Sequence, residues 1–440
     1  MRIYLVTIFI LTLSNCSFDS KTGIWNNSQN TISKEENKFK QFKKLYIEKK
    51  LFNDVIPPNE NLKISLEPIK KNTKWYDEFY QNSNNLENFV YKNLNKKIFK
   101  SKKLSRYKIK DRILFDGGNF LFTDVQGNII VYSISDKKIT LRYNFYKKKY
   151  KKIKKILNIV IQENIVYVSD NIGYLYAIDY VNNKFLWAKN FKIPFRSNIK
   201  IKKNYIVVSD INNSIYFIDK SKGQKLKVIP TEETRVKNEF INSIALNNNS
   251  LFYLNTYGSI YSIDNRGKID WFLNLSQSSD KDTSNLFNSN PLLLYENKVF
   301  IATDKQLHIF NSISGATNFT LPISTVVQPL VSKNNLFLIT KDNLLVCINI
   351  NEGKILYSID INQEVADFLD TKKKSIYIKS ISLLNNNIFV FLDNSYYVKF
   401  DVKGKISGIE RLPERISSLP IFINGSIIYL NNKNKLVIID

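Results

Sequence analysis

The chain has 440 residues, 43% of them apolar, and a formal net charge of +26. Its length allows two ordinary domains or one large all-β domain, and its apolar content is that of a globular protein. The positive charge is spread along the chain without base-stacking motifs, so we do not expect a nucleic-acid-binding protein and attribute most of the charge to surface solvation. The 25 tyrosines and 29 phenylalanines favour strands, and asparagine clusters take the place of the scarce glycines at turns.

The N-terminal stretch MRIYLVTIFILTLSNC has the pattern of a secretory signal. One positive charge at Arg2 precedes an apolar run over residues 3–13, which is too short to span a bilayer as a helix. We therefore predict a signal peptide over residues 1–15. Cys16 follows a Leu-Ser-Asn sequence that resembles the bacterial lipobox, and this resemblance implies acylation of Cys16 as the new N-terminus. The alternative is an ordinary secretory signal with an incidental cysteine.

Residues 16–60 are predicted to form a tether. Ser17, rather than an aspartate, follows the cysteine, and by resemblance to lipoprotein sorting in enteric bacteria this favours the outer membrane. Ser33 and Glu36 have the spacing of a capping box, and bulky apolar residues then recur at helical intervals up to Tyr46. We expect a short helix within this spacer.

A run of alternating apolar residues that ends in a polar residue occurs eight times. The final residues lie 38 to 52 residues apart, with a mean of about 44, which is the period of propeller blades. A turn and another apolar run follow each copy, and two further runs precede it. We predict an all-β fold, an eight-bladed β-propeller of four-stranded antiparallel blades, over residues 61–440 with blades from about residue 106. The copies end at Ser135, Asp179, Asp219, Asp264, Asn311, Asn349, Asp401 and Asp440.

The eighth copy ends at Asp440, before its last turn and outer strand. An unpaired blade end would expose a raw sheet edge, so we expect an N-terminal strand to close the last blade. Trp75 precedes the first blade and is the residue type found at Trp187 and Trp271, in the fourth strands of other copies. We therefore predict that residues 73–79 supply the closing strand and that Trp75 closes the ring.

The repeats resemble a known family. The units YAID…NNKFLW and YSIDNRGKIDW are similar to the repeat of pyrroloquinoline-quinone (PQQ) propellers. The order of lipobox, tether, tryptophan segment and eight blades resembles the BamB family of outer-membrane assembly lipoproteins, and NTKWYDEFYQNSNN resembles the closing segment of alphaproteobacterial members. The resemblance implies a non-enzymatic scaffold of the β-barrel assembly (BAM) complex, anchored at the periplasmic face of the outer membrane. It would bind a BamA-like barrel protein. It would also bind unfolded outer-membrane proteins and assist the folding and insertion of these clients.

Residue types for catalysis or metal binding are scarce. We expect His308, the one histidine, to lie on the surface of a strand of the fifth blade or to be packed there, and Cys347 to be a buried thiol. The sequence therefore offers few residues for nucleophilic catalysis of the Ser-His or Cys-His kind. We predict no enzymatic activity, no cofactor and no metal. The acidic residues that recur at blade turns are expected to cap hairpins: Asp179, Asp219, Asp264 and Asp401.

Two other functions fit the same fold. Quinone-dependent dehydrogenases share this kind of blade, but they generally run longer and many carry an adjacent Cys-Cys pair, which this sequence lacks. A lipoprotein that binds a glycan or a peptide in the central channel is the other alternative.

The stretch FYKKKYKKIKKI, residues 145–156, holds seven lysines between the first two blades. One interpretation is a basic loop with aromatic side chains at its tip that touches anionic lipid headgroups or an acidic partner. The other is a solvated connector in a lysine-rich chain. The residues assigned to partner or membrane contact are Tyr146, Lys147, Lys148, Lys149, Tyr150, Lys151 and Lys152.

Overall fold

The computed structural model describes residues 16–18, 25–27, 50–233, 240–276 and 287–440. The chain divides into two units, residues 1–49 and 50–440. In the first unit, β1 (Cys16–Phe18) pairs antiparallel with β2 (Trp25–Asn27). The predicted signal peptide and the helix expected within the tether lie outside the described residues, and acylation of Cys16 stays a prediction.

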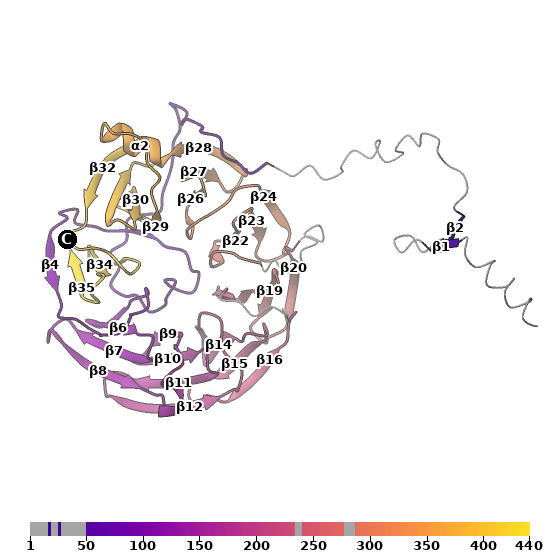
Figure 1. Ribbon diagram of the computed structural model, residues 1–440, viewed down its shortest axis with the longest axis vertical. Coiled ribbons are helices and arrows are strands. Elements are labelled where there is room, and N and C mark those ends of the chain that lie inside the picture. The colour runs from indigo at the N-terminus through magenta and orange to yellow at the C-terminus, as the bar shows by residue number, and fades with distance from the viewer. Residues whose placement is uncertain (1–15, 19–24, 28–49, 234–239, 277–286) are drawn as a thin grey trace, which may run out of the picture. The chain divides into compact units, whose positions relative to one another are not determined.

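The second unit is a ring of eight sheets, each of them a propeller blade (Figure 1). The predicted all-β fold with eight four-stranded antiparallel blades is confirmed. Each blade begins with a strand near the axis and ends with a strand at the rim, so the second and third strands are covered on both faces by neighbouring blades. This explains why their sequences are almost continuously apolar.

From the inner to the outer strand, blade one contains β5 (Leu114–Asp116), β6 (Asn119–Thr123), β7 (Asn128–Ser133) and β8 (Lys138–Asn144); blade two β9 (Leu157–Gln162), β10 (Ile165–Asp170), β11 (Tyr174–Asp179) and β12 (Lys184–Asn190); blade three β13 (Lys200–Lys202), β14 (Tyr205–Ser209), β15 (Ile215–Asp219) and β16 (Lys225–Ile229); and blade four β17 (Ser243–Leu246), β18 (Ser250–Leu254), β19 (Ser259–Asp264) and β20 (Ile269–Asn274). Blade five contains β21 (Leu293–Tyr295), β22 (Lys298–Ala302), β23 (Leu307–Asn311) and β24 (Thr317–Leu321); blade six β25 (Leu330–Ser332), β26 (Asn335–Ile339), β27 (Leu344–Asn349) and β28 (Lys354–Asp360); blade seven β29 (Ile378–Leu384), β30 (Asn387–Leu392), β31 (Tyr396–Phe400) and β32 (Ile406–Arg411); and blade eight β33 (Ile421–Ile423), β34 (Ser426–Leu430), β35 (Leu436–Ile439) and β4 (Lys97–Lys100).

The eight sequence repeats are the third strands of the eight blades. The acidic residue at the end of a repeat caps the following turn, as predicted. In blade two, Asp179 Oδ1 accepts hydrogen bonds from the backbone N–H groups of Val181 and Asn182, at 3.1 and 2.9 Å. The same capping occurs at Asp219, Asp264 and Asp401.

The third and fourth strands of every blade lose their register at the equivalent point, for example between Ala177 and Ile178. Such an irregularity increases the local twist of the strand pair. It therefore belongs to the blade design and is not a local defect.

The prediction that residues 73–79 supply the closing strand is wrong. Blade eight is completed by β4, which pairs antiparallel with β35, so an N-terminal strand does close the ring but comes from further along the chain. The reason is that Trp75 is not the counterpart of Trp187 and Trp271. Those two indoles each donate a hydrogen bond of 3.1 Å to a turn carbonyl of the next blade, whereas Trp75 lies in the channel.

Residues 50–60, assigned to the tether from the sequence, are part of the propeller unit. Ile56 bridges to Ser358 and so covers the outer strand of blade six. The chain then crosses the ring, where Asn335 Nδ2 donates to the Ser65 carbonyl at 2.8 Å, and enters the channel.

Among the described residues of the propeller unit, two short helical elements interrupt the strands. η2 (Lys148–Tyr150) lies between blades one and two, and α2 (Ile361–Phe368) lies between blades six and seven. Asp360 caps α2 by accepting hydrogen bonds from two backbone N–H groups. The α2 insertion explains the longest spacing between repeats. Within the described ranges, no helix has the length and apolar character needed to cross a bilayer.

Ser101→Ala tests the closure by β4. The Leu436 N–H donates to Ser101 Oγ, and the Ser101 N–H donates to the Leu436 carbonyl, both at 2.9 Å. The substitution leaves the buried Leu436 N–H without its side-chain acceptor, so we expect the free energy of unfolding to fall by about 1–3 kcal/mol in denaturant titrations. Ser417→Ala, at an exposed serine, should change it by less than about 0.5 kcal/mol. Equal effects would contradict closure at β4.

Candidate functional site

The strand connections give the propeller two different faces. On one, which we call the connector face, each outer strand leads to the inner strand of the next blade. The hairpin turns between the first and second strands, and between the third and fourth, lie on the opposite turn face. Because all blades share this order, the basic segment (residues 145–156) and the α2 insertion (residues 361–377) lie on the same connector face.

Residues 72–92, which we call the inner loop, make a full circuit inside the ring (Figure 1). Trp75 and Phe115 of blade one exchange two backbone hydrogen bonds of 2.8 Å. Further along, β3 (Asn88–Phe89) pairs in parallel with β29 of blade seven. In chain order the loop meets blades eight, one, two, three, four, five, six and seven, and then blade eight again.

The remaining contacts of this circuit are Asn72 Nδ2 to the Phe422 carbonyl in blade eight (2.8 Å), the Ile161 N–H to the Tyr76 carbonyl in blade two (2.9 Å), Lys200 Nζ to Asp77 in blade three (2.8 Å), the Leu246 N–H to the Asn82 carbonyl in blade four (2.8 Å), the Leu294 N–H to the Ser83 carbonyl in blade five (2.8 Å), the Val331 N–H to Asn85 Oδ1 in blade six (2.9 Å) and the Lys92 N–H to the Gly425 carbonyl in blade eight (3.0 Å).

Buried asparagines carry much of this circuit. Asn84 is fully buried, and its Nδ2 donates both to the Ile244 carbonyl in blade four and to the Leu292 carbonyl beside blade five, at 3.0 and 2.8 Å. Asn85 both donates to and accepts from the backbone of Val331. An amide side chain offers donors and an acceptor together, so it can pair with the exposed edge of an inner strand as backbone would.

Two ion pairs fix the inner loop to blades one to three. Lys200 is fully buried and donates to Asp77 Oδ2 at 2.8 Å and to the Gln81 carbonyl at 2.6 Å. Burial lowers the pKa of Lys200, and the Asp77 carboxylate opposes that shift. Glu78 pairs with Lys110 at 2.8 Å, and burial raises the pKa of Glu78 against the opposing charge of Lys110.

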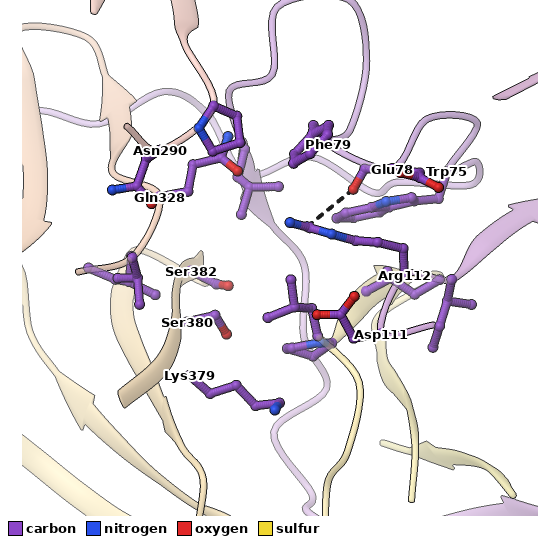
Figure 2. Close-up of a pocket in the computed structure, with 18 of the residues that line it drawn as sticks. Trp75, Glu78, Phe79, Asp111, Arg112, Asn290, Gln328, Lys379, Ser380 and Ser382 are labelled. Atoms are coloured by element: carbon purple, nitrogen blue, oxygen red, sulfur yellow. Dashed lines mark hydrogen bonds between the residues drawn. The ribbon is translucent and has the colours of Figure 1, made fainter. Parts of the chain in front are cut away.

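On its connector-face side, the inner loop forms the floor of a cavity of about 270 Å³ (Figure 2). Trp75 and Phe79 contribute from the loop, and the starts of the inner strands form the wall. Arg112 donates to the Glu78 carbonyl at 3.2 Å and lies 4.5 Å from the centre of the Phe79 ring. The channel is thus a shallow cup, closed by the chain's own N-terminal segment.

The basic segment is held against blades one and two by its aromatic residues. Tyr146 OH donates to Asp170 Oδ2 at 2.5 Å, and burial together with nearby Tyr176 and Asp170 raises the pKa of Tyr146. Tyr150 OH lies 3.2 Å from Tyr174 OH. These rings anchor the segment instead of forming the tip expected from the sequence, and six of the seven lysines face solvent, whereas Lys155 is buried.

The outer strands of blades two, three and four expose large apolar side chains. Phe272 is 58% exposed and Leu226 is 59% exposed. Because the three blades are neighbours, these residues lie on adjacent parts of the rim of the ring. We call this set the rim surface; it consists of Phe185, Leu186, Leu226, Ile269 and Phe272.

A family model described as outer membrane protein assembly factor BamB matches residues 147–359, which cover blades two to six. The structure of BamB from Moraxella catarrhalis is similar over 78% of this chain and 98% of its own, with a TM-score of 0.60 and 14% identity. The chain folds as a BamB-like propeller of PQQ-type repeats. No curated protein matches the sequence significantly.

Enzymes share the fold of this BamB-like propeller. The quinohemoprotein alcohol dehydrogenase from Comamonas testosteroni is similar over 84% of this chain and 80% of its own, with a TM-score of 0.63 and 8% identity. A europium-containing methanol dehydrogenase is similar over 83% and 89%, with a TM-score of 0.59 and 9% identity. At these identities the likeness establishes the fold alone.

The described residues of the BamB-like propeller do not form a site for a quinone bound together with a metal ion. Among the described residues, no three His, Cys, Asp or Glu side chains lie close enough together to hold a metal ion. The cup measures about 270 Å³, which is below the roughly 300–1,000 Å³ typical of small-molecule sites. Neither the described side chains nor the size of the cup therefore supports binding of a quinone together with a metal ion.

The structure confirms that His308 and Cys347, whose side chains are of reactive types, are packed within blades. His308 is buried on β23, stacks on Phe310 and has Nδ1 3.3 Å from Thr320 Oγ1, and burial lowers its pKa to about 4. Cys347 is fully buried on β27, and burial raises the pKa of its thiol. Both are packing residues of the blades.

Sequence reasoning missed the inner loop. Its polar stretch Gln81-Asn82-Ser83-Asn84-Asn85 has no strand or helix period and looks like a surface turn. The signal that could have found it is the aromatic residues on either side, Trp75 and Phe89, which would be unusual beside an exposed turn.

Lys200→Met tests the inner loop's attachment. The substitution leaves the Asp77 carboxylate buried without its cation, so we expect the free energy of unfolding to fall by about 3–5 kcal/mol. Lys202→Met is the matched control, because Lys202 is also buried on β13 but its Nζ has no hydrogen-bond partner. That control should be neutral or stabilising. Equal losses in the two variants, measured by denaturant titration, would contradict the pairing.

Acidification should destabilise the propeller through His308. Its pKa is about 4 in the folded protein and about 6.5 when unfolded, so the unfolded state binds more protons between these values and stability falls as pH falls. From pH 7 to 5 we expect a loss of about 2 kcal/mol that is absent in His308→Phe. Thr320→Val keeps the histidine and should keep this pH dependence. Identical pH profiles of wild type and His308→Phe would refute it.

Proposed function

We propose that this protein is a non-enzymatic scaffold of outer-membrane β-barrel assembly, held at the periplasmic face of the outer membrane by an acylated Cys16. The likeness to BamB supports this, and one observation carries it: the inner loop occupies the channel, so the large binding surfaces lie on the outside of the ring. Its partner is a BamA-like barrel protein, and unfolded outer-membrane proteins are its clients.

The rim surface is the best candidate for the protein partner. Its strands β12, β16 and β20 have no further strand paired to them in the described part of the chain, and an extended partner segment can add to such an edge. The exposed aromatic and aliphatic side chains supply the apolar contacts typical of an interface core. The outer strand of blade six differs, because Ile56 covers it.

A glycan or peptide ligand in the channel is the alternative. The cup could take a small group end-on, since Arg112 and Lys379 lie beside its apolar floor. A longer ligand could not thread the ring, because the inner loop bonds to all eight blades. The scaffold is therefore the function that the geometry supports best.

Site-specific cross-linking in membranes tests the scaffold. With a photoreactive residue at Phe272, we expect capture of a large β-barrel protein that has periplasmic domains. The same probe at Ser407, an exposed position on the outer strand of blade seven, should give at least about tenfold less, because binding at the buried centre of an interface dominates affinity. The double variant Leu226→Glu/Phe272→Glu should lose co-purification. Capture of no barrel protein from either position would favour the channel ligand.

A further inference from the structure

We propose that the connector face lies against an anionic phospholipid bilayer, with the basic segment as its electrostatic contact. This inference goes beyond the scaffold role, and it depends neither on the barrel-protein partner nor on acylation of Cys16.

Six lysines of the basic segment are exposed, and none forms an ion pair within the part of the chain that the structure describes. The seventh, Lys155, is buried and donates to the Tyr150 carbonyl. Unpaired lysines close to an anionic surface are each attracted to it, whatever their detailed geometry. The six are Lys147, Lys148, Lys149, Lys151, Lys152 and Lys154.

The segment presents this charge from a fixed position. Phe145 stacks on Tyr176 with ring centres 4.7 Å apart. The Tyr146 ring packs onto Gly127, whose φ of 85° and missing side chain allow this close approach. Because these contacts are already made, contact with a surface would cost little further conformational entropy.

Aliphatic side chains accompany the lysines. Ile153 and Ile156 are each 44% exposed within the basic segment. A second apolar group lies on the α2 insertion of the same face, where Phe368, Leu369 and Tyr377 are 49%, 51% and 77% exposed. Basic residues with exposed apolar side chains are the composition of elements that rest in a membrane interface.

A bilayer fits this face better than an acidic protein does. The basic segment contains lysine and no arginine, whereas protein interfaces are enriched in arginine and depleted in lysine. Blades seven, eight and one separate the two apolar groups. A flat surface can contact both at once, whereas a small protein domain would have to span the mouth of the channel.

A depth probe tests the orientation in the full chain. Cys16→Ser is combined with either Ile153→Cys or Ile313→Cys, each labelled with an environment-sensitive fluorophore; Cys347 is buried and stays unlabelled. Ile313 is 72% exposed on the turn face and serves as the control. With phosphatidylcholine vesicles that contain phosphatidylglycerol and a spin-labelled lipid, we expect quenching at position 153 and not at 313. Equal quenching at both positions, or equal quenching without phosphatidylglycerol, would overturn the proposal.

A charge variant isolates the basic segment. In the Ile153→Cys background, Lys147, Lys148, Lys151 and Lys152 are changed to Gln, which leaves the packing contacts of Lys149 and Lys155 in place. At about fivefold per lysine, the four changes together should weaken partitioning by about 600-fold. The matched control changes four exposed turn-face lysines to Gln (Lys137, Lys184, Lys222 and Lys268) and should retain most of the binding. The membrane contact would be refuted if the two four-lysine variants lost vesicle binding equally. It would also be refuted if an acidic protein domain changed the fluorescence of the label at position 153 and vesicles did not.

Discussion

The structure depends on how the inner edges of the eight sheets are satisfied. Each blade presents the edge of a short inner strand to the axis, and unpaired N–H and C=O groups there would be costly once buried. The inner loop supplies their partners through its own backbone and through asparagine amides. Since it meets every blade in order and returns to blade eight, it links each blade to the next through hydrogen bonds, and Asn84 alone bonds to both blade four and blade five. β4 then closes the ring from the outside.

This arrangement determines which surfaces remain for function. A channel filled by its own chain has little room for a substrate, and the cup that remains is bounded by Trp75 and Phe79. In our proposals, recognition uses two outward surfaces of different chemistry. The rim surface is apolar and offers free strand edges, whereas the connector face is basic around residues 145–156 and apolar around α2. A protein partner and a membrane could thus be bound at the same time without competing for one site.

The limits of the sequence-based prediction have physical causes. The third strands were predictable because burial on both faces leaves a strong apolar run, and a capping Asp or Asn ends nearly every copy. β4 was not predictable, because Lys97-Ile98-Phe99-Lys100 is a largely exposed edge strand with no such run. Trp75 was misplaced because a tryptophan that packs on a blade turn and one that packs in a channel look alike in sequence. The asparagines of the inner loop were missed because amides that replace backbone partners have the same composition as a turn.

Hydrogen exchange measured by mass spectrometry on the full-length protein tests the central claim most directly. If the inner loop is part of the ring, the amides of residues 75, 80, 90 and 92, which donate backbone hydrogen bonds, should exchange as slowly as those of the second strands. Slow exchange of both would show that they open together in one cooperative event. Fast exchange of the inner loop while the blades stay protected would contradict the account, because the ring would then be stable without it.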